Sequence, residues 1–264
     1  MLHYLYPDGK RKACTFSYDD NQIYDRRLID ILNQYELKAT FHINAGTLDQ
    51  EGFIKSDEVR ELYLGHEISC HGYSHPFMTH LSQTELAFEI MEERKILEMI
   101  TGYPIRGLSY PFGDYSDDVI MALKRFGMEY ARTVENTDAF GIPGDWMKWK
   151  PTCHHNGLSE ELISRFDCPP EYSRLPLLYI WGHSFEFERE KSWVLFEKMC
   201  SRLKQCTDVW FATNIEIKEY LTAVRGLICS ASCRTIYNPT AKTVFLLADE
   251  LVITVQPGET VTIP

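Results

Sequence analysis

The first 224 residues alternate short apolar runs with longer amphipathic stretches, a pattern that predicts parallel strands joined by helices. Two capping boxes of the Ser/Thr-x-x-Glu type, at residues 82–85 and 213–216, mark helix starts. Residues 135–177 show little periodicity and are expected to be irregular. The runs expected to be strands are 13–18, 39–44, 68–70, 107–110, 130–134, 177–182 and 209–213. These make seven or eight β/α units, which either open into a doubly wound sheet or close into a barrel.

The pattern changes after Val224. Short β-like runs then follow one another without helices, separated by the turn signals Asn238-Pro239 and Pro257-Gly258. The runs are 234–237, 243–247, 251–255 and 260–263. We therefore predict one β/α unit at 1–224, which would carry the barrel, and a small antiparallel β appendage of unknown role at 225–264.

Composition and charge narrow the function classes. The 264 residues are 44% hydrophobic, which is typical of a globular protein and excludes a disordered chain. The formal charge of −11 disfavours nucleic acid as a partner. No run of 18 apolar residues predicts a membrane span, and residues 1–10 lack the apolar stretch of a secretory signal. We expect a cytoplasmic protein whose eight cysteines are mostly free thiols.

Ionisable residues gather where predicted strands end, which is where α/β barrels place their reactive loops. Asp19 and Asp20 follow the first strand; one could bind a metal while the other acts as a base, or both could cap the next helix. His71 and His75 form an HxxxH pair on a loop interrupted by glycine and proline. Two imidazoles and a carboxylate would leave coordination positions open, as a catalytic metal site requires. The alternative is a pair of loop histidines bonded to the backbone.

Two further strand ends complete the set. The segment around Tyr110 and Phe112 is rich in aromatic residues, proline and glycine, and suits either a groove wall with exposed amides or an ordinary aromatic turn. Trp181 and His183 end another apolar strand. A histidine at that position has the reach to protonate a leaving group, although a lone histidine is more often structural.

Taken in this order, the aspartate pair, the HxxxH spacing and the strand-end histidine resemble the polysaccharide deacetylases of the NodB-homology family, carbohydrate esterase family 4. The resemblance covers roughly residues 12–220. It implies a distorted (β/α)7 or (β/α)8 barrel that hydrolyses N-acetyl groups on sugars with one divalent metal. That metal is usually zinc, with cobalt or nickel also used.

The resemblance also implies roles for individual residues. Asp19 matches the catalytic base and His183 the catalytic acid. The metal ligands would be Asp20, His71 and His75, and the substrate or oxyanion contacts Tyr110, the Phe112 amide and Trp181.

Two departures from the family pattern stand out. Ser109 occupies the place of an arginine that usually pairs with the base, and Arg132, at the next strand end, is the candidate to replace it unless it forms a surface ion pair. The aspartate and tryptophan that tune the acid histidine have no clear match. Asp138 or Asp145-Trp146 could supply them if the irregular segment folds back over the site, and Glu186 could also approach His183. His154 and His155 are either loop histidines or substrate contacts.

The leading hypothesis is a metal-dependent hydrolase that removes N-acetyl, or O-acetyl, groups from a carbohydrate and releases acetate. One alternative is hydrolysis of another C–N bond, such as that of a cyclic ureide or imide, without a metal. The other is a sugar-binding protein with a degenerate site. The expected partner is an acetylated saccharide or a small amide, and dimer contacts are one role open to the appendage.

Overall fold

The computed structural model describes residues 2–170 and 173–263. Its centre is a sheet of parallel strands in the order β6-β5-β4-β3-β2-β8-β7, with β9 paired to the start of β2. The strands are β2 (Lys12–Asp19), β3 (Ala39–Ile43), β4 (Glu67–Cys70), β5 (Gly107–Ser109), β6 (Tyr130–Arg132), β7 (Cys153–His154), β8 (Leu177–His183) and β9 (Val209–Phe211). The sheet curls into the predicted distorted barrel.

The segment 149–154 joins the two edges of this sheet. Trp149 forms a parallel bridge with Arg132 of β6, and its amide donates to the Ala131 carbonyl. Four residues later, Cys153 pairs with Ile180 of β8. One stretch of chain therefore contacts both edges and leaves neither fully unpaired.

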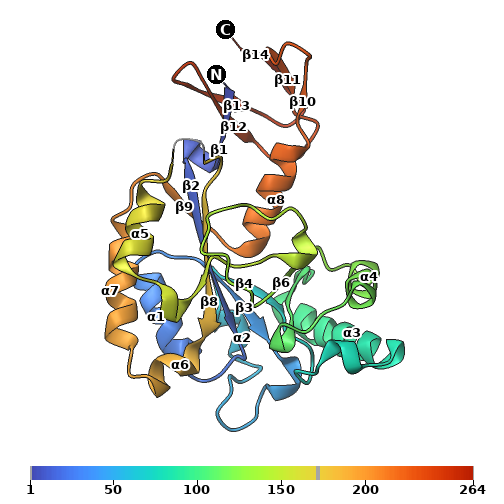
Figure 1. Ribbon diagram of the computed structural model, residues 1–264. Coiled ribbons are helices and arrows are strands. Elements are labelled where there is room, and N and C mark those ends of the chain that lie inside the picture. Colours follow the sequence, from blue (N-terminus) through green and yellow to red (C-terminus); the bar gives the residue numbers. More distant parts are fainter. Residues whose placement is uncertain (1, 171–172, 264) are drawn as a thin grey trace.

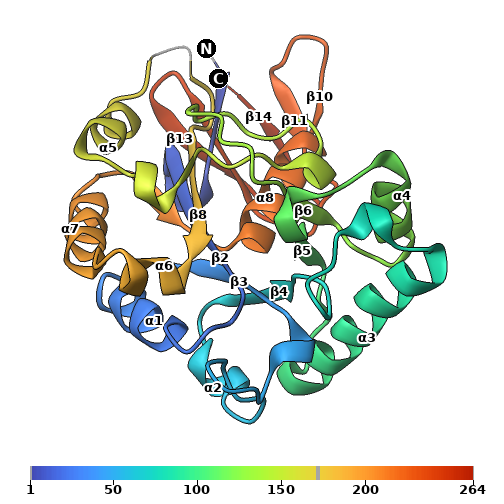
Figure 2. The same ribbon diagram turned by 60° about the horizontal axis from the view of Figure 1, so that its bottom comes forward.

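Helices surround the barrel, as Figure 2 shows for α1, α3, α4 and α7. Their bounds are α1 (Asp25–Gln34), α2 (Val59–Leu62), α3 (Gln83–Thr101), α4 (Asp117–Arg125), α5 (Glu160–Asp167), α6 (Ser184–Arg189), α7 (Trp193–Lys204) and α8 (Asn214–Arg225). The two predicted capping boxes open α3 and α8. The expectation of an irregular 135–177 segment is wrong in part, because this stretch contains β7 and α5. Helix α5 is only eight residues long, too short for a clear helical period.

Side chains alternate between two environments along the strands. On β2, Phe16 and Tyr18 pack in the apolar core beneath the outer helices. The alternate residues Ser17 and Asp19 contact polar groups of other strands: Ser17 Oγ lies 2.8 Å from His42 Nε2, and Asp19 pairs with Arg132. The barrel interior is therefore polar, and the strand period of two directs every second residue into it.

Helix α8 closes the amino end of this polar interior. The backbone N–H of Asn214 donates to Thr40 Oγ1. Its side-chain Nδ2 donates to the Tyr179 hydroxyl, and its side-chain Oδ1 accepts from Thr15 Oγ1. Because these partners lie on three different strands, the first turn of α8 fixes the strands relative to one another. The carboxyl ends of the strands remain for the site.

The appendage consists of two antiparallel sheets at the amino end of the barrel, beside both chain termini in Figure 1. One sheet is β1 (Leu2–Leu5), β12 (Val244–Ala248) and β13 (Leu251–Val255); the other is β10 (Ile228–Cys229), β11 (Thr235–Tyr237) and β14 (Thr260–Thr262). Residues 2–5 thus pair with the appendage, although the division at 224/225 places them with the barrel. The division into units itself stays a prediction.

Among the helices that the structure describes, none combines the length and the apolar character that crossing a membrane requires.

Candidate active site

The two adjacent aspartates diverge at the end of β2. Asp19 is 3% exposed and points into the barrel, whereas the Asp20 side chain is 21% exposed and faces the loop after β4. Asp20 adopts a φ of +77°, a left-handed conformation that aspartate tolerates better than most residues. Both carboxylates stay within 4.0 Å of His71 and His183, but only Asp19 is buried. This difference in exposure suits the two carboxylates to different roles.

Asp20 lies opposite both histidines of the HxxxH pair. Its Oδ1 is 3.5 Å from His71 Nε2 and 3.7 Å from His75 Nε2. One ligand atom from each of Asp20, His71 and His75 lies within 4.8 Å of the others. Three residues separated by up to 55 positions in the chain therefore converge on one small volume.

The donor chemistry of this cluster fits a divalent metal. His71 Nδ1 lies 2.9 Å from the Ser109 carbonyl oxygen, which only accepts hydrogen bonds, so the ring proton belongs on Nδ1. The Nε2 lone pair then faces Asp20. Two imidazole nitrogens and one carboxylate form a set that catalytic zinc sites use, and a histidine fixed by its other nitrogen is typical of such sites.

Helix α3 and the end of β3 hold the loop that carries these histidines. Both oxygens of Glu93 accept backbone amides, from His71 at 3.1 Å and Gly72 at 2.9 Å. Asn44 donates to the carbonyls of the same two residues at 2.8 and 2.7 Å. Burial raises the pKa of Glu93 to about 8, although the hydrogen bonds it accepts oppose the rise. The loop is thus fastened by side chains that do not themselves reach the ligand cluster.

Asp19 is held by Arg132, whose side chain is fully buried. An Arg132 nitrogen pairs with Asp19 Oδ2, and the Ser109 hydroxyl donates to Oδ1 at 3.0 Å. Burial alone would raise the pKa of Asp19, but the Arg132 guanidinium, followed by nearby histidines, holds it well below its usual range. Trp181 covers the guanidinium, with its ring centre 4.5 Å away. Asp19 is therefore an ionised carboxylate with a fixed orientation.

His183 lies across the site from the aspartates. Its Nε2 is 4.0 Å from Asp19 Oδ2 and 4.0 Å from Asp20 Oδ2, and its Nδ1 is 3.1 Å from Glu186 Oε2. Burial would lower the pKa of His183, but Glu186 and the two aspartates outweigh it and raise the pKa. These charges favour the protonated imidazole, whose Nε2 faces Asp19.

The predicted substrate residues differ in accessibility. Phe112 is 55% exposed, stacks on Phe77 with ring centres 4.1 Å apart, and contacts the His75 ring at 4.4 Å. Trp181 is half-buried and donates to Asn136. The Tyr110 hydroxyl, by contrast, is buried and donates to the Met147 carbonyl, so its side chain packs away from the ligand cluster. Phe112 and His75 have positive φ angles, like Asp20, and such strain is common at functional sites.

Asp138 and Asp145, the candidates for tuning the acid histidine, make other contacts. Asp145 caps a short turn by accepting from the Met147 amide, and Asp138 is exposed with its amide bonded to Thr152. Neither of these interactions involves His183, whose carboxylate partner is Glu186. Sequence reasoning missed Glu93 and Asn44 altogether. Asn44 has the signal of ending the predicted strand 39–44, whereas Glu93 lies among charged residues in the middle of α3 and has none.

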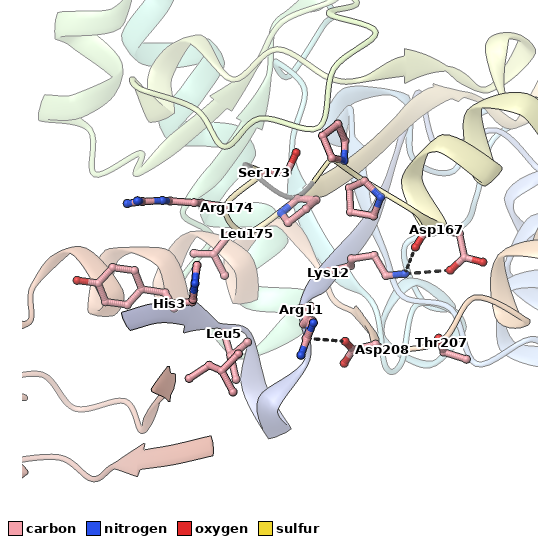
Figure 3. A pocket seen from close by; sticks show the side chains of 15 residues that line it. His3, Leu5, Arg11, Lys12, Asp167, Ser173, Arg174, Leu175, Thr207 and Asp208 are labelled. Atoms are coloured by element: carbon pink, nitrogen blue, oxygen red, sulfur yellow. Dashed lines mark hydrogen bonds and ion pairs between the residues drawn. The ribbon is translucent and has the colours of Figure 1, made fainter. Parts of the chain in front are cut away.

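A cavity of about 510 Å³ lies elsewhere, at the amino ends of β2, β8 and β9. Figure 3 shows two ion pairs along its wall, Lys12 with Asp167 and Arg11 with Asp208. None of the candidate site residues lines it. In barrels the chemistry belongs to the opposite, carboxyl end, where the clustered aspartates and histidines lie.

Comparison with known proteins identifies similar sequences and structures. Residues 7–131 match the family described as polysaccharide deacetylase. The predicted resemblance is confirmed. The chain is 29% identical over 118 residues to a peptidoglycan-N-acetylmuramic acid deacetylase of Bacillus subtilis, covering 45% of this chain and 25% of that protein. It is 25% identical over 116 residues to a chitooligosaccharide deacetylase of Sinorhizobium fredii, covering 43% and 52%. The chain thus spans about a quarter to a half of these relatives.

Solved structures of polysaccharide deacetylases share the fold over most of the chain. A Mycobacterium smegmatis protein assigned to the family matches with a TM-score of 0.62 and 17% identity, covering 84% of this chain and 94% of that one. A pseudoenzyme of carbohydrate esterase family 4 from Bacillus anthracis matches with a TM-score of 0.55 and 18% identity, covering 82% and 68%. At these sequence identities the structural likeness establishes the barrel fold only. The chemistry has to be argued from the side chains of the site.

Replacing Glu93 with glutamine tests the support of the histidine loop. The amide nitrogen of glutamine would face a backbone N–H, leaving a buried donor unpaired at a cost of about 1–3 kcal/mol in stability. Because the loop positions His71 and His75, we also expect roughly 10- to 100-fold weaker metal binding. Thermal unfolding and metal titration measure both effects, with Glu92→Gln on the same helix as control. Equal affinity in Glu93→Gln and the native protein would contradict this role.

Proposed function

We propose that the protein is a metal-dependent hydrolase that removes N-acetyl groups, or O-acetyl groups, from a carbohydrate and releases acetate. The observation that carries the proposal is the convergence of Asp20, His71 and His75 beside an ionised Asp19 and opposite His183. The family match and the deacetylase relatives support a carbohydrate substrate.

Asp20, His71 and His75 would hold the divalent cation, most readily zinc, with cobalt or nickel as substitutes. When bound, such a cation supplies a Lewis acid beside the substrate carbonyl. The protein contributes the geometry, because His71 is fixed through Ser109 and its loop through Glu93.

Asp19 serves as the general base in this proposal. Its carboxylate is ionised, buried and oriented by Arg132, so it can accept a proton from the attacking water while remaining in place. Because Arg132 occupies one oxygen and Ser109 the other, Asp19 is poorly placed to bind a metal itself. This separates its role from that of Asp20.

His183 serves as the general acid. An amine is a poor leaving group until it is protonated, and the cationic imidazole faces Asp19 across a gap of 4.0 Å. Glu186 holds the imidazole through Nδ1 and leaves Nε2 directed at the reacting centre. The backbone N–H of Phe112, whose ring contacts His75, is proposed to donate a hydrogen bond to the oxyanion.

The proposal is tested by measuring acetate release from N-acetyl chitooligosaccharides, O-acetyl esters and cyclic amides, with and without chelator. We expect acetate from an N-acetyl or O-acetyl saccharide, lost on chelation and restored by added zinc. Turnover of a cyclic amide in the presence of chelator would instead identify the C–N hydrolase alternative. Saccharide binding without acetate release would identify a degenerate sugar-binding site.

Replacing His183 with alanine should lower kcat by roughly 10²- to 10⁴-fold, the range typical of a general acid. Metal bound by Asp20, His71 and His75 should be retained, because His183 is not one of the three ligands and comes no nearer to Asp20 Oδ2 than 4.0 Å. Steady-state kinetics with a metal titration at this site separates the two effects. If His183→Ala kept the native kcat, His183 would not be the general acid.

The exposed Phe77–Phe112 pair suits the apolar face of a sugar ring, next to His75. Phe77→Ala should therefore raise KM severalfold for an oligosaccharide while leaving kcat nearly unchanged. Phe88→Ala, which removes another exposed phenylalanine, is the control. An unchanged KM in Phe77→Ala would exclude this surface as a sugar contact.

A cytoplasmic location, the absence of a nucleic-acid partner and self-association through the appendage stay predictions. Cell fractionation and sedimentation of the purified chain test the first and the last.

A further inference from the structure

A second group of metal-ligating side chains lies beside the proposed active site, around a single carboxylate oxygen. Glu186 Oε2 is 3.0 Å from His154 Nε2, 3.1 Å from His183 Nδ1 and 3.5 Å from His155 Nε2. One ligand atom from each of His154, His183 and Glu186 lies within 4.8 Å of the others. Three imidazoles therefore converge on one anionic oxygen.

The pairing of β7 with β8 brings these residues together. His154 is in register with Trp181, two residues before His183, and Glu186 lies on the first turn of α6. A Cβ on Gly182 would lie 2.1 Å from His155 Nδ1, so only glycine leaves room for that ring against the strand. The arrangement is therefore built into the fold rather than formed by mobile surface side chains.

One imidazole of this cluster has ring nitrogens that make no hydrogen bond. The His155 side chain is fully buried, and neither of its ring nitrogens has a hydrogen-bond partner among the described residues. Its Nε2 points toward Glu186 Oε2 from 3.5 Å, beyond the usual hydrogen-bond length. Arg189 binds the other oxygen, Oε1, at 3.2 Å, whereas Oε2 accepts the His183 backbone amide at 3.1 Å in addition to facing the imidazoles. An unpartnered buried imidazole aimed at a carboxylate is what a metal ligand looks like before the ion is bound.

We propose that His154, His183 and Glu186 form a second divalent-metal site of the zinc type, separate from Asp20, His71 and His75, with His155 Nε2 as the nearest further donor. Imidazole nitrogens with one carboxylate suit zinc, nickel and copper and disfavour magnesium or calcium, which prefer oxygen ligands. His154 Nδ1 accepts the Asn156 amide at 3.3 Å, so a neutral ring carries its proton on Nε2. Metal binding at Nε2 moves that proton to Nδ1, breaks this hydrogen bond and releases to solvent any further proton shared with Glu186.

The two sites share His183 through opposite ring nitrogens. Nδ1 faces Glu186, whereas Nε2 faces Asp19 and Asp20. A cation bound at Nδ1 removes the proton that makes the ring an imidazolium, and the ring then becomes a weaker acid at Nε2. If the proposed function holds, excess metal therefore inhibits the enzyme that stoichiometric metal activates.

Counting bound zinc tests the site independently of activity. Equilibrium dialysis with Zn²⁺ is applied to the native chain, Asp20→Asn, His154→Gln and the double variant, with His80→Gln, at an exposed histidine, as control. Counts are compared with the double variant, so that zinc on exposed thiols such as Cys229 and Cys233 cancels. We expect two zinc ions above that reference for the native chain and His80→Gln, and one for each single variant.

Two results would overturn the second site: a native count of one, or a His154→Gln count equal to the native count. Because glutamine can still hydrogen-bond to Glu186, an unfolded variant is not expected, and circular dichroism checks this. The activity readout is separate. Rising zinc should first activate and then inhibit the native enzyme, whereas His154→Gln should lose the inhibition, by tenfold or more in the inhibiting concentration. If the zinc counts are as expected but the protein releases no acetate, the second metal site is supported and the proposed deacetylase function is rejected.

Discussion

Replacing Arg132 with methionine is expected to lower kcat/KM by roughly 100-fold or more and to destabilise the fold by about 3–5 kcal/mol. Methionine preserves much of the side-chain volume but leaves Asp19 buried without its cation. Burial then favours the neutral carboxylic acid, which cannot accept a proton from water. The large effect follows from Arg132 being fully buried, because a surface pair would contribute little.

Arg26→Met provides the matched control for this prediction. Arg26 contacts Glu58 at 2.6 Å, but the two side chains are 43% and 32% exposed. Its loss should cost no more than about 1 kcal/mol and leave kcat/KM unchanged. Chemical denaturation and steady-state kinetics measure both variants. If Arg132→Met kept native kcat/KM, the account of how the base is held would be wrong.

Replacing Asp20 with asparagine should abolish tight metal binding at the first site and reduce turnover to background. Asparagine tolerates the +77° φ of this position, so the backbone is not strained as it would be by alanine. The substitution removes the anionic ligand, whereas Asp20 contributes little to packing because its side chain is 21% exposed. We therefore expect a melting temperature within a few degrees of the native value together with complete loss of function.

The control for Asp20→Asn is Asp8→Asn, an exposed aspartate that also has a positive φ, of 59°. It should leave metal binding and turnover unchanged. Metal titrations are best done in the His154→Gln background, so that the second cluster does not contribute. Native turnover in Asp20→Asn would show that the chemistry needs no cation at this site.

The location of most site residues could be predicted because each follows a buried strand. Asp19, His71 and His183 end strands whose apolar runs are visible in the sequence, and parallel strands bring their carboxyl ends together. Arg132 could be proposed for the same reason. The resemblance also named Asp19 as its partner. That the pair is fully buried could not be predicted, because the sequence does not say that the ring of strands places β6 across from β2.

Other features left no local signal. Glu93 lies within a run of charged residues on α3 and resembles a solvent-exposed helix face, yet it is fully buried against the histidine loop. The pairing of β1 with β12 joins segments about 240 residues apart, a contact that no local pattern encodes. Glu186 was noted only as a neighbour of His183, because its contacts with His154 and His155 depend on how 149–154 closes the sheet.

The most direct test of the central claim is an anomalous-difference map at the zinc edge, from crystals grown with one equivalent of zinc. The account predicts a single strong peak about 2.0–2.2 Å from a carboxylate oxygen of Asp20 and from Nε2 of both His71 and His75. It also predicts that Asp19 remains paired with Arg132 and outside the coordination sphere. A chain that is active with zinc bound elsewhere, and with no peak between these three side chains, would contradict it.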